Sequence, residues 1–180
     1  GHNHPHGNQS RVSRIDYSND TAVAAAKGPL ASYRAYISAT GNQSYGYFGS
    51  GVQSGSSIST ITRVDYSNDT PTSVDKGPLS VARQYRAATG NTTHGYWVGG
   101  ASHVSTVQRL DYASDTTAGI ERAYLVNGTD RFGGMSAAAN ALGVGLQGAA
   151  SNIGVDRVPV GTGYGYFVGG NDPGDRSIVQ

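Results

Sequence analysis

Arg14-Ile-Asp-Tyr-Ser-Asn-Asp-Thr21 is an octapeptide that the chain repeats twice more with small changes. The later copies are Arg63-Val-Asp-Tyr-Ser-Asn-Asp-Thr70 and Arg109-Leu-Asp-Tyr-Ala-Ser-Asp-Thr116, so their leading arginines follow at steps of 49 and 46 residues. A period in the range of about 20–50 residues is typical of proteins whose units stack or are arranged radially. The fold is therefore best predicted from one unit.

Other landmarks keep the same spacing between the first two units. Lys27-Gly-Pro-Leu30 returns as Lys76-Gly-Pro-Leu79, and Gly46-Tyr-Phe48 returns as Gly95-Tyr-Trp97. The third unit lacks a Gly-Pro-Leu, although Arg157 follows Arg109 at a step of 48 residues. We predict one repeat domain over residues 1–180, with units at 8–51, 52–100, 101–134 (shortened) and 151–180 (degenerate), and an Ala/Gly-rich loop at 135–150.

The composition favours short strands and tight turns. The 180 residues include 27 glycines and 12 tyrosines, with only 14% charged residues, which predicts an all-β protein. Thirteen basic and twelve acidic residues nearly cancel, so we expect no nucleic-acid partner. The chain has no apolar run long enough to predict insertion into a membrane, and no cysteine.

Residues 59–66 alternate around β-branched side chains and predict a strand. The following Ser67-Asn-Asp-Thr70 is typical of a turn, since Asn and Asp side chains bind nearby backbone amides. Residues 81–88 form a second β-capable run, and residues 94–98 a third one that ends in Gly99-Gly100. Each unit is thus predicted to be an antiparallel meander of three or four strands.

This order of features resembles the kelch repeat, whose unit is one four-stranded blade of a β-propeller. The double glycines at 99–100 and 169–170, the Asp-Tyr before each turn, and Gly77-Pro-Leu-Ser-Val-Ala-Arg83 carry the resemblance. The tryptophan of the kelch pattern is missing after Tyr17, Tyr66 and Tyr112. The resemblance implies kelch-like propeller blades, about three to four in number.

The amino-acid sequence of the unit is also similar to repeats in fibre-like structural proteins of aquatic bacteriophages. That similarity implies a location outside the cell or on a virion surface. It also implies a non-catalytic structural or adhesive role as a segment of a filament, appendage or fibre. A propeller that binds a glycan or a cell-surface receptor is the alternative, and we expect no cofactor for either function.

The ends of the chain suggest how copies associate. Arg176-Ser-Ile-Val-Gln180 matches the residues that precede the octapeptide arginine. Within one chain, the two end segments could lie side by side and close a ring, and the sequence could also be the visible part of a longer array. Between chains, the last segment of one copy could complete the first unit of another, so we expect the chain to pair with copies of itself, head to tail or in a ring, through an edge at Ser177, Ile178 and Val179. Within the units, repeated arginines and tyrosines are expected to tie strands or blades together; these are Arg14, Arg63, Arg109, Arg157, Tyr17, Tyr66 and Tyr112.

Three further sets of residues are candidates for binding or modification. Aspartates four residues apart offer oxygen ligands for calcium, but their spacing matches no calcium loop, and a turn role is favoured; they are Asp16, Asp20, Asp65, Asp69, Asp111 and Asp115. Recurring aromatic residues either pack in the core or stack on a glycan or another subunit; they are Tyr47, Tyr96, Trp97 and Tyr166. Six sequons make N-glycosylation candidates of Asn8, Asn19, Asn42, Asn68, Asn91 and Asn127.

Nothing in the sequence suggests catalysis. His94 and His103 have no carboxylate motif or nucleophile elbow beside them, and Glu121 is the only glutamate. Without a nucleophile paired with a base, or two acidic groups poised for acid–base chemistry, there is no residue set to assign to an active site. We therefore expect that the protein is not an enzyme.

Overall fold

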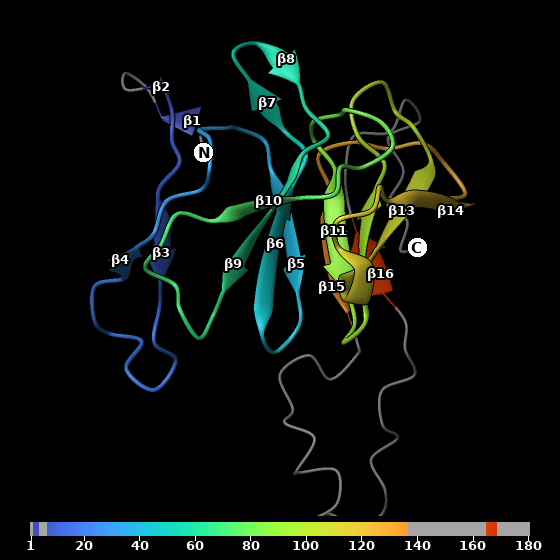
Figure 1. The fold of residues 1–180 in the computed structure, drawn as a ribbon. Coiled ribbons are helices and arrows are strands. Elements are labelled where there is room, and N and C mark those ends of the chain that lie inside the picture. Colours follow the sequence, from blue (N-terminus) through green and yellow to red (C-terminus); the bar gives the residue numbers. More distant parts are fainter. Residues whose placement is uncertain (1, 4–6, 137–164, 169–180) are drawn as a thin grey trace, which may run out of the picture.

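The computed structural model describes residues 2–3, 7–136 and 165–168, and in these ranges the regular elements are β-strands, with one short 3₁₀-helix, η1 (Tyr112–Ser114). The strands form antiparallel sheets of two to four strands that lie side by side along the molecule (Figure 1). The prediction of an all-β protein is confirmed.

Two of the sheets are four-stranded meanders in which each strand pairs with the next. We call these two sheets the first and second full sheets. The hairpin of β7 (Val52–Gln53) and β8 (Ser56–Ser57) projects from the first full sheet. The first full sheet contains β5 (Ser38–Gly41), β6 (Tyr45–Gly49), β9 (Ile61–Asp65) and β10 (Val74–Lys76). The second contains β11 (Ala87–Gly90), β12 (His94–Val98), β13 (Thr106–Asp111) and β14 (Ile120–Tyr124).

Two-stranded sheets flank the full sheets. The N-terminal half-sheet consists of β3 (Val12–Arg14) and β4 (Ala25–Lys27), and a small hairpin of β1 (His2–Asn3) and β2 (Gly7–Asn8) precedes it. The C-terminal half-sheet consists of β15 (Gly133–Ser136) and β16 (Gly165–Val168). By their position in the repeat, β3 and β4 correspond to the third and fourth strands of a full sheet. Strands β15 and β16 correspond to the first and second.

The sheets are out of phase with the predicted sequence units. The first full sheet takes β5 and β6 from the unit predicted at 8–51, and β9 and β10 from the unit predicted at 52–100. The second full sheet is likewise shared between units 52–100 and 101–134. The octapeptide thus provides the end of a third strand and the turn into the fourth.

Two details of the predicted strands need correction. A strand was predicted over residues 81–88, but β11 begins only at Ala87, because Tyr85 has a left-handed backbone (φ 59°) that an extended strand cannot contain. Strand β10 was not predicted, since its three residues have no periodicity and it forms by pairing with β9, Val74 opposite Arg63.

The C-terminal part of the chain also differs from the prediction. The residues of the shortened unit predicted at 101–134 are divided between two sheets. Strand β14 closes the second full sheet, and β15 begins at Gly133 in a different sheet. Met135 and Ser136, assigned to a loop, belong to β15. The rest of that loop and most of the degenerate unit lie outside the described residues.

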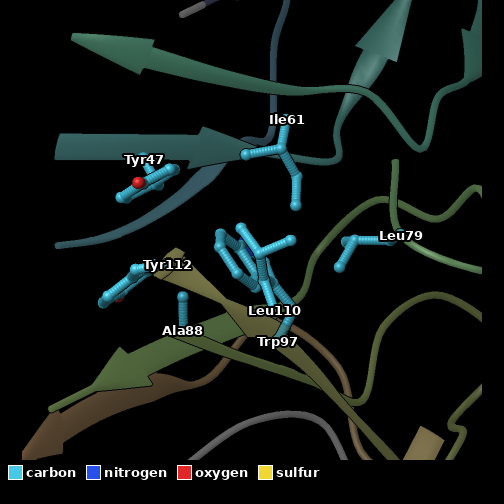
Figure 2. Packing of buried hydrophobic residues seen from close by; sticks show 7 residues of the cluster. All are labelled: Tyr47, Ile61, Leu79, Ala88, Trp97, Leu110 and Tyr112. Atoms are coloured by element: carbon cyan, nitrogen blue, oxygen red, sulfur yellow. The ribbon is translucent and has the colours of Figure 1, made fainter. Parts of the chain in front are cut away.

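The core lies between the two full sheets (Figure 2). Trp97 and Tyr47 are its largest fully buried aromatic side chains, and such rings bury more apolar area than any other residue type. The first strands of successive sheets contact each other in turn, since β11 contacts both β5 and β15. The core residues are Tyr47, Ile61, Leu79, Ala88, Trp97, Leu110 and Tyr112.

Candidate functional site

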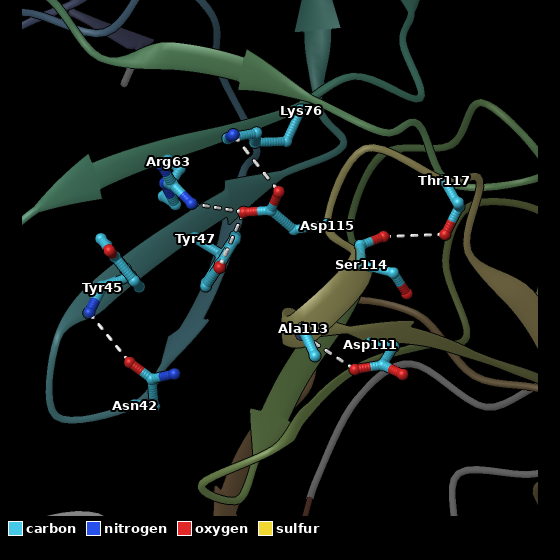
Figure 3. A network of polar contacts seen from close by, with 10 residues as sticks. All are labelled: Asn42, Tyr45, Tyr47, Arg63, Lys76, Asp111, Ala113, Ser114, Asp115 and Thr117. Carbon is cyan, nitrogen blue, oxygen red and sulfur yellow. Dashed lines mark hydrogen bonds and ion pairs between the residues drawn. The ribbon is translucent and has the colours of Figure 1, made fainter.

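The contact that joins one sheet to the next centres on Asp115. This residue follows η1 in the second full sheet, and its carboxylate lies against the face of the first (Figure 3). Arg63 Nη1 lies 2.7 Å from Oδ2 and Lys76 Nζ lies 3.2 Å from Oδ1. The phenol of Tyr47 donates a hydrogen bond of 3.0 Å to Oδ2. One buried carboxylate therefore binds three strands of the neighbouring sheet.

The electrostatics of this junction favour its charged and hydrogen-bonded form. Burial raises the pKa of the Tyr47 phenol well above its ordinary value, and the hydrogen bond to Asp115 adds to the rise. Burial works against the charge of Arg63, but the Asp115 carboxylate and the Tyr47 phenol together outweigh this effect and raise the pKa of the guanidinium. The guanidinium also lies 4.2 Å from the ring centroid of Tyr45.

The same junction occurs one repeat earlier. Asp69 of the first full sheet lies 2.7 Å from Arg14 and 3.1 Å from Lys27, both in the N-terminal half-sheet. Burial alone would raise the pKa of Asp69, but the hydrogen bond from Lys27 and the charge of Arg14 lower it. Arg14 and Arg63, two of the arginines expected to tie neighbouring sheets, are thus bound to the last aspartate of the next octapeptide.

The repeated Lys-Gly-Pro-Leu completes the junction through its backbone. The N–H of Gly28 donates to the carbonyl of Asp69 (2.9 Å), and the N–H of Gly77 donates to the carbonyl of Asp115 (2.7 Å). A Cβ at Gly77 would lie 2.0 Å from the carbonyl oxygen of Thr117. Glycine is therefore required here by the close approach of two backbones.

One repeat tyrosine, Tyr112, contributes to the same contact. Tyr112 stacks on Tyr47 of the first full sheet with ring centroids 4.5 Å apart and an interplanar angle of 7°. Its hydroxyl lies 3.3 Å from Oγ1 of Thr40. Burial raises the pKa of Tyr112 to about 12. Tyr47 and Tyr112, 65 positions apart in the sequence, thus pack against each other between the two full sheets.

The first aspartate of each octapeptide stabilises the turn in which it lies. Oδ1 of Asp16 accepts hydrogen bonds from both the N–H and the hydroxyl of Ser18, and Asp65 binds Ser67 in the same way. Asp111 accepts from the N–H of Ala113. These are the turn roles favoured over calcium binding, and no cluster of three His, Asp or Glu residues that could hold a metal is found among the described residues.

The aromatic candidates divide by burial. Tyr47 and Trp97 are fully buried between the two full sheets, so their rings contact protein and not solvent. Tyr96 is half-buried on β12, and Tyr166 takes part in β16. Arg157, Ser177, Ile178 and Val179 lie outside the described residues.

The sequon asparagines lie in turns and loops, apart from Asn8 in β2. Oδ1 of Asn42 accepts the backbone N–H of Tyr45, and Oδ1 of Asn91 accepts that of His94. Their side chains therefore have a structural use in the turn between the first two strands of each full sheet. Glycosylation at any of the six stays a prediction.

The sequence did not reveal an aromatic ladder beside the first strands. Tyr36 and Tyr85 have ring centroids 4.6 Å apart, and the Arg131 guanidinium lies 4.3 Å from the centroid of Tyr85. All three have left-handed backbones, with φ from 53° to 59°. The sequence did contain a sign of this contact, because Tyr36 and Tyr85 are separated by the repeat step of 49 residues and so occupy equivalent positions in successive units.

Comparison with known proteins does not identify a relative. No protein-family model matches the chain, and no curated protein is significantly similar to it.

In the part of the chain that the structure describes, no helix has the length and apolar character needed to cross a membrane.

Proposed function

We propose that this protein is a non-catalytic structural repeat protein that acts by self-association outside the cell or on a virion surface. The observation that carries the proposal is the repeated junction. Arg14 with Asp69 and Arg63 with Asp115 join successive sheets by the same chemistry, with the same 2.7 Å distance. A surface that joins one sheet to a similar neighbour within the chain can also join sheets of different chains.

For the finer architecture we propose kelch-like blades. Support comes from the four-stranded antiparallel meanders and from the adjacency of their first strands. Gly99 and Gly100 both have positive φ, and Gly100 donates its N–H to Thr129 near the following half-sheet. A diglycine that links one blade to the next would need this geometry.

The test of self-association is direct. Purified chain should form oligomers or filaments in analytical ultracentrifugation and negative-stain microscopy, and the assemblies should weaken as salt screens the ion pairs. A chain that stays monomeric up to about 1 mM would refute the proposal.

A glycan-binding module is the second candidate, and the aromatic ladder favours it. Tyr33 and Tyr36 are about half exposed near the projecting β7–β8 hairpin, and the Tyr33 hydroxyl lies 3.0 Å from Ser54 Oγ. Exposed tyrosine rings next to hydroxyl groups suit stacking on sugars. On a glycan array, wild-type chain should bind and Tyr36→Ser should not; a wild-type chain that binds no glycan would remove this candidate.

A further inference from the structure

The two half-sheets together contain the four strand positions of one full sheet. We propose that β16 of one copy pairs antiparallel with β3 of a second copy, which builds a composite sheet in the order β15, β16, β3, β4. This inference rests on the proposed function and names the surface through which the copies bind.

Among the residues that the structure describes, the strand edges that would pair carry no further strand. In both full sheets the second strand pairs with the third, β6 with β9 and β12 with β13. Among the described residues, β3 pairs along its length with β4, and β16 with β15. Open edges of this kind are the usual sites of strand addition between chains.

The full sheets also give the register. Tyr47 lies opposite Arg63 in the first, and Tyr96 lies opposite Arg109 in the second. The same alignment places Tyr166 opposite Arg14. It also places Phe167 opposite Ser13, as Phe48 lies opposite Thr62.

Exposure of the repeat tyrosine supports a missing neighbour at the N-terminal half-sheet. Tyr112, with a full sheet before it, is 9% exposed; Tyr66, preceded by a half-sheet, is 50% exposed; Tyr17 is 93% exposed. The position two residues earlier follows the same order, from Leu110 at 1% to Ile15 at 55%. Tyr17 and Ile15 thus form an apolar face at the position that the core occupies in the other repeats, and a second copy would cover it.

The ion pairs supply an independent argument. Each junction pairs an arginine of one sheet with the last aspartate of the octapeptide in the next sheet. The sheet after Arg109 is the C-terminal half-sheet, which becomes complete when β3 and β4 of a second copy join it. Those strands bring Asp20, the aspartate in the corresponding place.

Both members of this expected pair are available. Asp20 is exposed and forms no ion pair among the described residues, and the Nε atom of Arg109 is buried without a hydrogen-bond partner there. In the same alignment, Tyr17 meets Tyr96, as Tyr112 meets Tyr47. The composite sheet therefore reproduces strand pairing, ring stacking and the ion pair at once.

The partner is a second copy because the two half-sheets of one chain do not meet. In Figure 1 the N-terminal half-sheet lies at the left of the molecule and the C-terminal half-sheet lies beside the second full sheet, with the first full sheet between the two half-sheets. The contact is therefore head to tail, which gives a closed ring or an open filament depending on the rotation between copies.

Charge reversal tests the proposal. Asp20→Arg and Arg109→Asp should each weaken self-association about 100-fold, since each puts like charges together at the interface. An equimolar mixture should restore it, because each variant's altered end then meets an opposite charge on the other. Association of Asp20→Arg equal to wild type would overturn the inference while self-association itself stands. A wild-type chain that is monomeric would overturn the proposed function as well.

A cross-link tests the register without depending on charge. The chain has no cysteine, and opposed residues of antiparallel strands have Cα atoms about 4.5–5.5 Å apart, within the range of a disulfide. Ser13→Cys chain mixed with Phe167→Cys chain should form a disulfide-linked dimer under mild oxidation. Ser13→Cys mixed with Val126→Cys should not, because Val126 is exposed in the loop after β14 and lies outside the proposed pairing of β16 with β3. Equal yields from both mixtures would contradict the proposed pairing.

Discussion

The phenol oxygen of Tyr47 lies 3.0 Å from Oδ2 of Asp115, and neither side chain has appreciable contact with solvent. This contact links the second strand of one sheet to the turn of the next, across 68 residues of sequence. Because Arg63 binds the same oxygen, the aspartate is shared by a neutral donor and a cation. Four predictions test how much this junction and the core around it contribute.

Asp115→Asn should lower the free energy of unfolding by about 2–3 kcal/mol, because it removes the negative charge that Arg63 and Lys76 share in a mostly buried site. Urea unfolding in dilute solution, followed by Trp97 fluorescence, measures the change. Asp20→Asn is the matched control, since it alters the corresponding exposed aspartate and should cost less than about 0.5 kcal/mol. Equal losses from both variants would contradict the role of Asp115.

Gly77→Ala should destabilise the protein by at least about 3 kcal/mol or prevent folding, because the new methyl group meets the backbone of Thr117 and not a movable side chain. Gly55→Ala provides the comparison. Its Cβ would meet nothing within 4 Å, so only the left-handed backbone (φ 82°) opposes it, at about 1–2 kcal/mol. Thermal unfolding by circular dichroism separates the two, and similar melting temperatures would refute the close approach.

Trp97→Ala should cost about 3–5 kcal/mol, the range for emptying a buried aromatic site, since Trp97 is fully buried between the full sheets. Tyr124→Ala should cost less than about 1 kcal/mol, because Tyr124 is mostly exposed at the end of β14. Chemical unfolding followed by circular dichroism serves for both variants, as Trp97 is the only tryptophan. A small loss from Trp97→Ala would place the core elsewhere.

Stability should fall as the pH rises above about 10, the ordinary pKa of tyrosine. Tyr47 and Tyr112 have raised pKa values in the folded protein, that of Tyr112 reaching about 12. Their contribution is therefore fully present below pH 10 and is lost as the pH rises toward the folded values. For Tyr112 alone, linkage gives a loss on the order of 2–3 kcal/mol.

Unfolding by urea at a series of alkaline pH values measures this loss, and Tyr47→Phe should make the decline shallower because one titrating group is removed. A stability that is flat between pH 9 and pH 12 would contradict the burial of these phenols.

Features that depend on nearby residues were predictable from the sequence. The strand at 94–98 is β12, the strand at 59–66 contains β9, and the aspartates of the turns bind amides two residues away. In each case β-propensity, or the reach of a short side chain, acts within a few residues. The all-β class and the four-stranded meanders follow from these local preferences and from the repeat.

Features that depend on which surfaces meet needed the tertiary structure. The sequence showed Lys76 and Gly77 as repeated residues, but not that both bind Asp115 of the following repeat. It did not show that the left-handed Tyr85 delays β11, or that the sheets are shared between sequence units. Such contacts join residues tens of positions apart, and their geometry is set by packing between sheets, which no local preference encodes. The sequence by itself determined a repeating β-protein and its turns; tertiary packing decided how each repeat binds the next.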